Sequence, residues 1–111
     1  MVQSKTDLFD KDLAQKAELF KALAHPARLQ ILKFLAQTRF CITGDISDEL
    51  PLGRTTVNQH LKELIKVGLI KGHIEGVKTK YCLEPIRMKE LKQSLGSFLE
   101  EIQPGEGYVC G

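Results

Sequence analysis

The chain has 111 residues, of which 42% are hydrophobic and 27% charged, and its formal net charge is +2. This length suits one small domain, which often completes its core with a partner subunit. No apolar run approaches membrane-spanning length and residues 1–5 lack a signal-peptide core, so we expect a cytoplasmic protein. The odd number and wide spacing of Cys41, Cys82 and Cys110 argue against a disulfide scaffold.

Two helices are predicted in the first third of the chain. The first covers residues 10–24 and has apolar residues on one face at helical spacing. These are Leu13, Ala17, Phe20, and Leu23 or Ala24. Pro26 opens the second helix, because proline is well tolerated at the first helical position, and His25 is a weak N-cap. Its expected core stripe consists of Leu29, Ile31, Leu32 and Leu35, widened by Phe34.

A helix-turn-helix is predicted in the middle of the chain. After a connector, Thr43 or Asp45 can cap a short third helix that ends at Leu50. Ile46 and Leu50 form its apolar i, i+4 pair. Residues 51–53 form a tight turn with a glycine, and a longer helix begins at Gly53. Two helices joined by such a turn are typical of the helix-turn-helix motif.

The longer helix, which Gly68 closes as a left-handed C-terminal cap, has one apolar and one polar side. The apolar side holds Val57, Leu61, Leu64 and Ile65. The opposite side holds Thr55, Gln59, Lys62 and Lys66, with Asn58 on its flank. Hydroxyl, amide and ammonium groups bind base edges and phosphates in a major groove. Glu63 is the one acidic residue in this helix.

A β-hairpin is predicted directly after this helix, over residues 69–74 and 77–83, with its turn at Glu75 and Gly76. Lys78 and Lys80 alternate with apolar and hydroxyl side chains, so we expect a basic wing. Pro85 starts a last helix that continues to about residue 102 and has a broad apolar face. That face consists of Ile86, Leu91, Leu95, Phe98, Leu99 and Ile102.

Positive charge is concentrated around the longer helix and the hairpin. Residues 54–80 hold six Lys or Arg residues against two Glu residues, whereas the rest of the chain holds 10 basic and 12 acidic residues. This distribution favours a nucleic-acid partner for that region. A solvated lysine-rich face is the plainer interpretation of the charge taken alone.

We therefore predict a mainly α fold with a small β-hairpin, a winged helix-turn-helix with about five helices and a two-stranded wing. Residues 1–103 form the domain and residues 104–111 a flexible tail. The two terminal helices carry more apolar surface than one small domain needs, so we expect a homodimer through them. The alternative is that both stripes pack inside one subunit.

Five short sequence motifs along the chain together form a highly specific combination. They are FKALAHPARLQIL at residues 20–32, GDI at 44–46, TTVNQHLKEL at 55–64, GLI at 68–70 and YCL at 81–83. The chain resembles the ArsR/SmtB-type winged-helix repressors of bacteria. The resemblance implies a small homodimeric transcription repressor that leaves its operator when a metal ion, arsenite or another thiol-reactive signal binds.

The sensing residues of that family match this chain poorly. Where many members have a Cys-x-Cys pair, this chain has Cys41-Ile42-Thr43, and a hydroxyl is a poor ligand for soft metals. Where others bind zinc through Asp and His at the start of the last helix, this chain has Arg87, and no His follows His73. We therefore predict no metal ligands and no cofactor.

Cys41 is the best remaining sensor candidate, as a thiolate that reacts with an oxidant or joins a soft-metal site. The alternative is a small apolar residue packed beside Phe40. A site for arsenite from Cys41, Cys82 and Cys110 is a further alternative, disfavoured by its spacing. His60, on the edge of the longer helix, is expected to be a structural histidine hydrogen-bonded between elements.

The function expected from these observations is sequence-specific binding to a double-stranded DNA operator. The candidate contacts to bases and nearby phosphates are Arg54, Thr55, Thr56, Asn58 and Gln59. Those to the DNA backbone are Lys62 and Lys66, together with Lys78 and Lys80 on the wing. The alternatives are a protein-binding winged helix and a DNA-binding regulator that responds to no ligand. We expect no enzyme, because no nucleophile with a base, paired carboxylates or phosphate-binding loop occurs.

Overall fold

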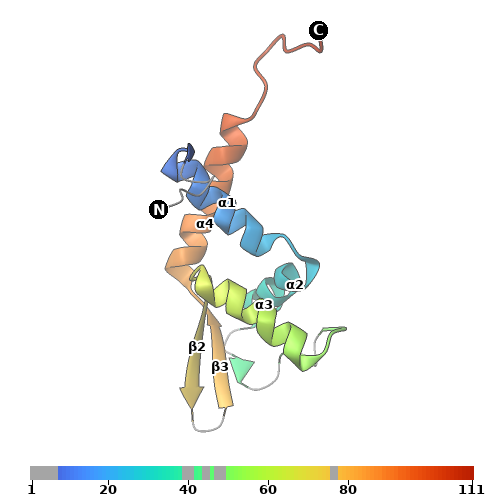
Figure 1. Ribbon diagram of the computed structural model, residues 1–111, viewed down its shortest axis with the longest axis vertical. Helices are drawn as coiled ribbons and strands as arrows, with labels where there is room; N and C mark the ends of the chain where they lie inside the picture. The colour runs from blue at the N-terminus through green and yellow to red at the C-terminus, as the bar shows by residue number, and fades with distance from the viewer. Residues whose placement is uncertain (1–7, 39–41, 44–45, 47–49, 76–77) are drawn as a thin grey trace.

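The computed structural model describes residues 8–38, 42–43, 46, 50–75 and 78–111 (Figure 1). Its elements are α1 (Lys11–Leu23), α2 (Pro26–Gln37), β1 (Ile42–Thr43), α3 (Arg54–Lys66), β2 (Ile70–Glu75), β3 (Lys78–Leu83) and α4 (Pro85–Glu101). Figure 1 shows α1, the outer part of α4 and the C-terminal segment at one end of the molecule, with α3 and the β2–β3 wing toward the other. The predicted winged helix-turn-helix architecture is confirmed.

The wing is an antiparallel ribbon extended by a third, very short strand. The strand order is β1-β3-β2, and β2 and β3 pair from Ile70 opposite Leu83 to Glu75 opposite Lys78. The connector predicted after α2 supplies β1, in which Ile42 pairs with Tyr81. A two-residue strand is too short to show an alternating pattern, so the sequence did not reveal it. The predicted turn residue Gly76 lies outside the described residues.

The predicted short helix of the helix-turn-helix falls mostly outside the described residues. The two described positions in it, Ile46 and Leu50, have exposed fractions of 2% and 8%. Both are therefore buried, as the predicted apolar pair requires. The described part of the chain holds four helices, and the expected fifth is the one that lies outside it.

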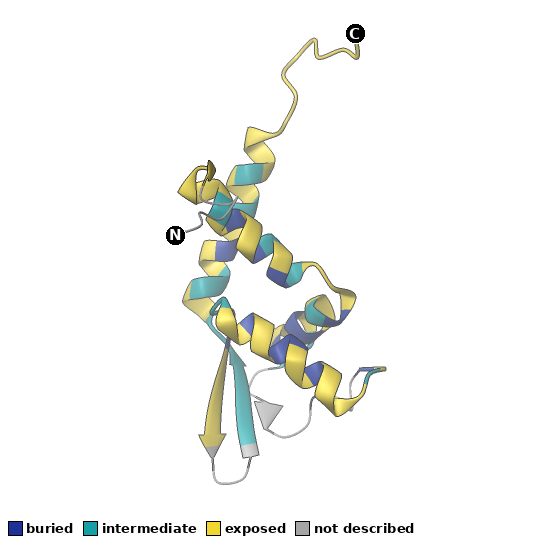
Figure 2. Cartoon of the chain, viewed as in Figure 1, coloured by how far each residue is buried: buried dark blue, intermediate teal, exposed yellow. Residues whose placement is uncertain are grey.

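The hydrophobic core joins α1, α2 and α3 to the base of the wing. Its most enclosed side chains are Ile31, Ile46, Val57, Leu61, Leu64, Leu69 and Ile70. Figure 2 shows the buried positions of α2 and α3 turned toward each other while the opposite face of α3 is exposed. Burial of one face of α3 therefore determines which face meets solvent. None of the helices in the described ranges is long and apolar enough to cross a membrane.

The predicted apolar face of α1 is not the face that packs inside the subunit. Leu13 and Ala17 of that face are exposed, whereas α1 packs on the core through Lys16, Leu19 and Ala22. Burial of the ammonium of Lys16 is tolerated because its Nζ lies 2.8 Å from an Asp12 oxygen and 3.8 Å from a Glu101 oxygen.

Two residues predicted in core stripes lie outside the core. Leu29 of α2 is 48% exposed and Ile65 of α3 is 38% exposed. At 100° per residue, Leu29 lies far from the line of Ile31 and Leu35, and Ile65 lies at the edge of the α3 stripe. His60 takes a buried position on α3 instead, with 8% exposure.

His60 ties α3 to α2, as predicted for a structural histidine. Its Nδ1 accepts a hydrogen bond from Nε of Arg28 at 3.1 Å. Arg28 also donates from Nη1 to the carbonyls of Lys21 and Ala22, both at 3.2 Å. One guanidinium therefore joins the end of α1, the start of α2 and the buried side of α3.

The neighbouring His25 completes this polar cluster. Its Nδ1 accepts from the backbone N–H of Ala27 at 3.0 Å, so it serves as the N-cap of α2. Its ring lies 4.2 Å from that of His60, centroid to centroid. Burial lowers the pKa of His60 below its usual value of 6.5, and the proximity of His25 and of the positive Arg28 lowers it further.

This lowered pKa predicts that the fold loses stability in mild acid. The unfolded chain takes up the His60 proton more readily than the folded chain, so the contribution is complete above about pH 6.5 and is lost as the pH falls through the lowered pKa. We expect the free energy of unfolding in urea to fall between about pH 7.5 and about pH 5.5. His60→Asn, which keeps an acceptor but does not titrate, should flatten that dependence. An unchanged slope would contradict this assignment.

Candidate nucleic-acid interface

The start and end of α3 are determined by two glycines. Gly53 is the N-cap, and its carbonyl accepts from the N–H of Val57 at 3.0 Å. At the other end Gly68 has a φ of +83°, and its N–H donates to Ile65 at 2.9 Å. A side chain at that φ would be strained, which explains the glycine. The predicted left-handed cap at Gly68 is confirmed.

The outer face of α3 consists of Thr55, Gln59, Lys62 and Lys66, all exposed. They lie opposite the buried residues of the same helix, and Asn58 is exposed on one flank. Figure 2 shows this exposed side along the whole length of α3. The outer face offers hydroxyl, amide and ammonium groups without a carboxylate among them. Such a surface can donate hydrogen bonds to phosphates and can donate to or accept from base edges.

The remaining candidates on α3 lie at the edges of this face. Arg54 and Thr56 belong to the first helical turn, and both are exposed. Glu63 is exposed as well, beside the outer face rather than within it. The structure therefore brings all seven predicted residues of α3 to the surface, with Arg54 and Thr56 on opposite edges.

The wing candidates lie on β3. Lys80 is half-buried and is the cross-strand partner of the exposed His73, so the two share one face of the ribbon. Lys78 is the first residue of β3, opposite Glu75, and its side chain lies outside the described part. A third basic residue of the wing, Lys71, forms an ion pair with Glu84.

Gly72 contributes to the packing of the wing against α3, and the sequence analysis did not identify it. A Cβ added there would lie 3.4 Å from Cδ1 of Ile65 and 3.6 Å from Cε1 of Tyr81. These are ordinary contact distances, so the wing packs against α3 at Gly72 and a side chain larger than alanine would crowd Ile65. A glycine inside a strand pattern is the signal that could have indicated this approach.

The cysteines correct one expectation. Cys82 is half-buried in β3 and disulfide-bonded, whereas Cys110 is an exposed free thiol. The argument against disulfides rested on spacing along the chain, but antiparallel pairing of β1 with β3 joins segments that are distant in sequence. A disulfide at Cys82 also removes one thiolate from the three-cysteine arsenite alternative. Cys41 lies outside the described residues.

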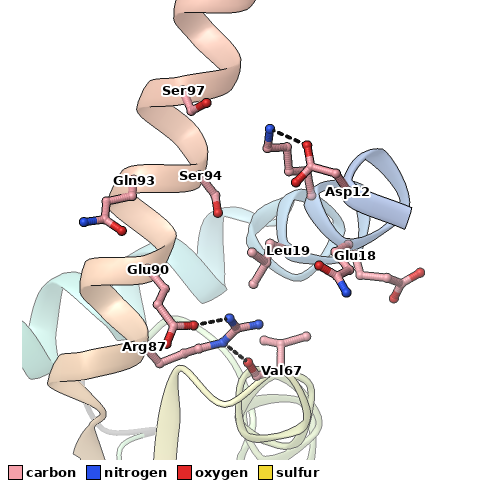
Figure 3. Close-up of a pocket in the computed structure, with 11 residues that line it drawn as sticks. Asp12, Glu18, Leu19, Val67, Arg87, Glu90, Gln93, Ser94 and Ser97 are labelled. Atoms are coloured by element: carbon pink, nitrogen blue, oxygen red, sulfur yellow. Dashed lines mark hydrogen bonds and ion pairs between the residues drawn. The ribbon is translucent and has the colours of Figure 1, made fainter. Parts of the chain in front are cut away.

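At the start of α4, where other members of the family that the sequence resembles bind zinc, this chain has the positively charged guanidinium of Arg87. Arg87 donates from Nε to the carbonyl of Val67 and from Nη1 to Glu90 (Figure 3). Across the described ranges, no three His, Cys, Asp or Glu side chains gather in a way that could hold a metal ion. A polar groove of about 610 Å³ runs from Arg87 between α4 and α1.

Comparison with known proteins places this geometry in a family. Residues 25–71 match the model of the bacterial regulatory protein, arsR family. The chain is 40% identical over 75 residues to an HTH-type transcriptional regulator of Methanocaldococcus jannaschii, which covers 68% of this chain and 84% of that protein. It is 31% identical over 86 residues to the transcriptional activator HlyU of Vibrio cholerae, and this match covers 78% of this chain and 79% of HlyU.

A solved structure extends the likeness over nearly the whole chain. It is the solution structure of a homodimeric winged helix-turn-helix DNA-binding domain of Mycobacterium bovis, described as a possible ArsR-family regulator. The TM-score is 0.63 at 25% identity, with 98% of this chain and 99% of that chain covered. The chain therefore belongs to the ArsR family and is a DNA-binding transcriptional regulator with a winged helix-turn-helix, not an enzyme.

Proposed function

We propose that the protein is a homodimeric repressor that binds a specific operator through the outer face of α3. The observation that carries this proposal is the exposed row of Thr55, Gln59, Lys62 and Lys66 opposite the buried stripe. A row of this chemistry on a helix beside a basic ribbon suits a major groove flanked by phosphates. A protein that binds an operator in this way acts in the cytoplasm.

Each candidate residue has a separate role in this proposal. Arg54, Thr55, Thr56, Asn58 and Gln59 contact base edges and nearby phosphates. Lys62 and Lys66, further along α3, bind the DNA backbone. Lys78 and Lys80 on the wing contact flanking phosphate or the minor groove.

The terminal helices supply the dimer interface in this proposal. α4 has 17 residues yet buries Leu91 alone. Its exposed apolar residues are Ile86, Leu99 and Ile102, and those at the start of α1 are Leu8, Phe9 and Leu13. An apolar hollow of about 280 Å³ lies along α1 between Phe9 and Ala17. So much exposed apolar surface on two neighbouring helices favours a second copy as its cover, as in the homodimeric relative.

The domain boundary follows from the same helices. Residues 1–103 form the DNA-binding and dimerising unit in this proposal, and residues 104–111 are a flexible tail. In support, every residue from Pro104 to Gly111 is exposed, and the segment extends away from the end of α4 (Figure 1).

The proposed regulation is release of the operator by a chemical signal. The family resemblance implies a metal ion, arsenite or a thiol-reactive compound. Cys110 is a free exposed thiol on which a thiol-reactive signal can act, whereas the disulfide of Cys82 can respond to a reductant. A regulator that responds to no ligand is the alternative, and adding oxidant, reductant or arsenite to the operator complex distinguishes the two.

One observation favours a second candidate function, a winged helix that binds protein. Ile74 in β2 is 82% exposed, and an apolar side chain on a wing suits a protein surface. Selection of binding sites from a random duplex library, followed by fluorescence anisotropy, decides between the two functions. Operator binding predicts enrichment of an inverted repeat whose half-sites lie roughly 34–36 Å apart. Failure to enrich any sequence would favour the protein-binding function.

Two substitutions on α3 test the division of roles. Gln59→Ala should reduce the ratio of operator to random-DNA affinity about tenfold, because a base contact contributes discrimination. Lys66→Ala is the matched control: it should weaken binding to both DNAs alike and lower the log–log salt slope by about one. Anisotropy over a salt series measures both quantities. Equal losses on both DNAs for Gln59→Ala would contradict its role in base recognition.

The dimer is tested by placing a charge on the apolar surface. Leu13→Glu and Leu99→Glu should yield monomers of the 12.5 kDa chain in sedimentation equilibrium. They should also weaken operator binding roughly a hundredfold or more, because each monomer then binds a single half-site on its own. Ile74→Glu, which charges an exposed isoleucine on the wing, is the control and should remain dimeric. A dimer that survives both terminal-helix changes would exclude this interface.

A further inference from the structure

We propose that Arg87 is a positioning residue that holds the C-terminal end of α3, so that α4 determines where the two recognition helices of the dimer lie. This inference rests on the proposed homodimeric operator binding. It concerns a residue outside the set of proposed DNA contacts, in the first turn of the helix that carries exposed apolar side chains for dimer contact.

The contact joins the start of one helix to the end of another. Nε of Arg87 donates to the carbonyl of Val67 at 3.0 Å, and Val67 is the C-cap residue of α3. The last carbonyls of a helix have no partner within it and carry its negative end. A guanidinium placed there satisfies one carbonyl and is attracted by the helix dipole. Arg87 therefore caps α3 from outside that helix.

The guanidinium is itself held in place. Its Nη1 lies 2.8 Å from an oxygen of Glu90, three residues along α4. Figure 3 shows Arg87 bridging Glu90 and the Val67 carbonyl at the base of the groove. Two hydrogen bonds to different groups restrict a planar cation more than one does. The side chain of Arg87 is only 35% exposed, so both contacts are partly shielded from water.

Gly68 brings the two elements close together. A Cβ added at Gly68 would lie 3.6 Å from Nε and 3.7 Å from Cγ of Arg87. The turn that ends α3 therefore packs directly on the stem of the arginine. Just beyond it, the N–H of Glu84 donates to the carbonyl of Leu69 at 2.9 Å, and Glu84 is the N-cap residue of α4. Three consecutive residues after α3, Val67 to Leu69, thus all contact the start of α4.

Through this junction, the direction of α4 determines the position of α3. A helix of 17 residues is about 25 Å long, and α4 buries Leu91 alone. Met88, Leu91 and Leu95 pack on the core, while exposed apolar residues such as Leu99 and Ile102 remain available to a partner subunit and the first turn holds α3. A small change in the direction of α4 relative to the junction would shift the recognition helix on the DNA. Loss of the Arg87 contact should allow several helix separations rather than one.

The spacing of the operator half-sites reports this freedom directly. We would measure binding of wild type, Arg87→Met, Arg87→Lys and Glu90→Gln to the selected operator and to versions with one base pair added or removed between half-sites. Each change shifts a half-site by about 3.4 Å and rotates it around the duplex. Arg87→Met keeps the stem that packs on Gly68 but removes the donor to Val67.

We expect wild type to lose at least about tenfold in affinity with either altered spacing, and Arg87→Met to lose about threefold or less. Affinity for random DNA and the dimer fraction should not change. Arg87→Lys keeps a cation near the Val67 carbonyl, so it should lose more affinity with altered spacing than Arg87→Met does, but less than wild type. Glu90→Gln should lose nearly as much affinity as wild type, because the hydrogen bond from Arg87 to Val67 remains.

Two results would overturn the inference. One is a spacing penalty for Arg87→Met equal to that of wild type. The other is an equal loss on the operator, on its spacing variants and on random DNA, which would indicate a stabilising or phosphate-binding role. Should Arg87→Met fail to fold, Arg87→Gln, with a shorter polar side chain, replaces it in the same comparison. Failure of the proposed function itself is distinct, because wild type would then bind the selected DNA no better than random DNA.

Discussion

The structure depends on burial of one stripe of α3, formed by Val57, Leu61 and Leu64. These side chains lie in the core with Ile31 and Ile46 and determine the rotation of the helix about its axis. Rotation by one residue would move an apolar side chain outward and a lysine or glutamine inward, at the cost of burying an unpaired polar group. The same packing that stabilises the domain therefore exposes the polar face of α3 that is proposed to contact DNA.

Polar contacts then determine the position of α3 along and across the core. Arg28 and His60 act at its middle and Arg87 at its end. Each contact is directional, unlike apolar packing, which tolerates small rotations and slides. A recognition helix needs this precision because base contacts fail when a donor and an acceptor are displaced by a fraction of an ångström.

Much of the fold could be predicted because its signals are local. Pro26, Gly68 and Pro85 lie at helix boundaries, and each predicted element within the described residues lies within a few residues of its expected bounds. The contact partners that the sequence did not reveal are distant along the chain: Arg28 and His60 are 32 residues apart, and Arg87 and Val67 are 20 apart. The Cys82 disulfide belongs to the same class. Periodicity describes which face a residue occupies, but not which residue of another element meets it.

The strand order β1-β3-β2 places β2 at an edge of the described sheet. An edge strand presents backbone donors and acceptors to which another chain can add, and the exposed Ile74 makes that addition more favourable. The strand is short, with six residues, and includes the exposed Lys71 and His73, whose polar side chains oppose stacking of identical copies. The edge of β2 therefore combines a backbone to which another strand can add with polar side chains that limit such addition.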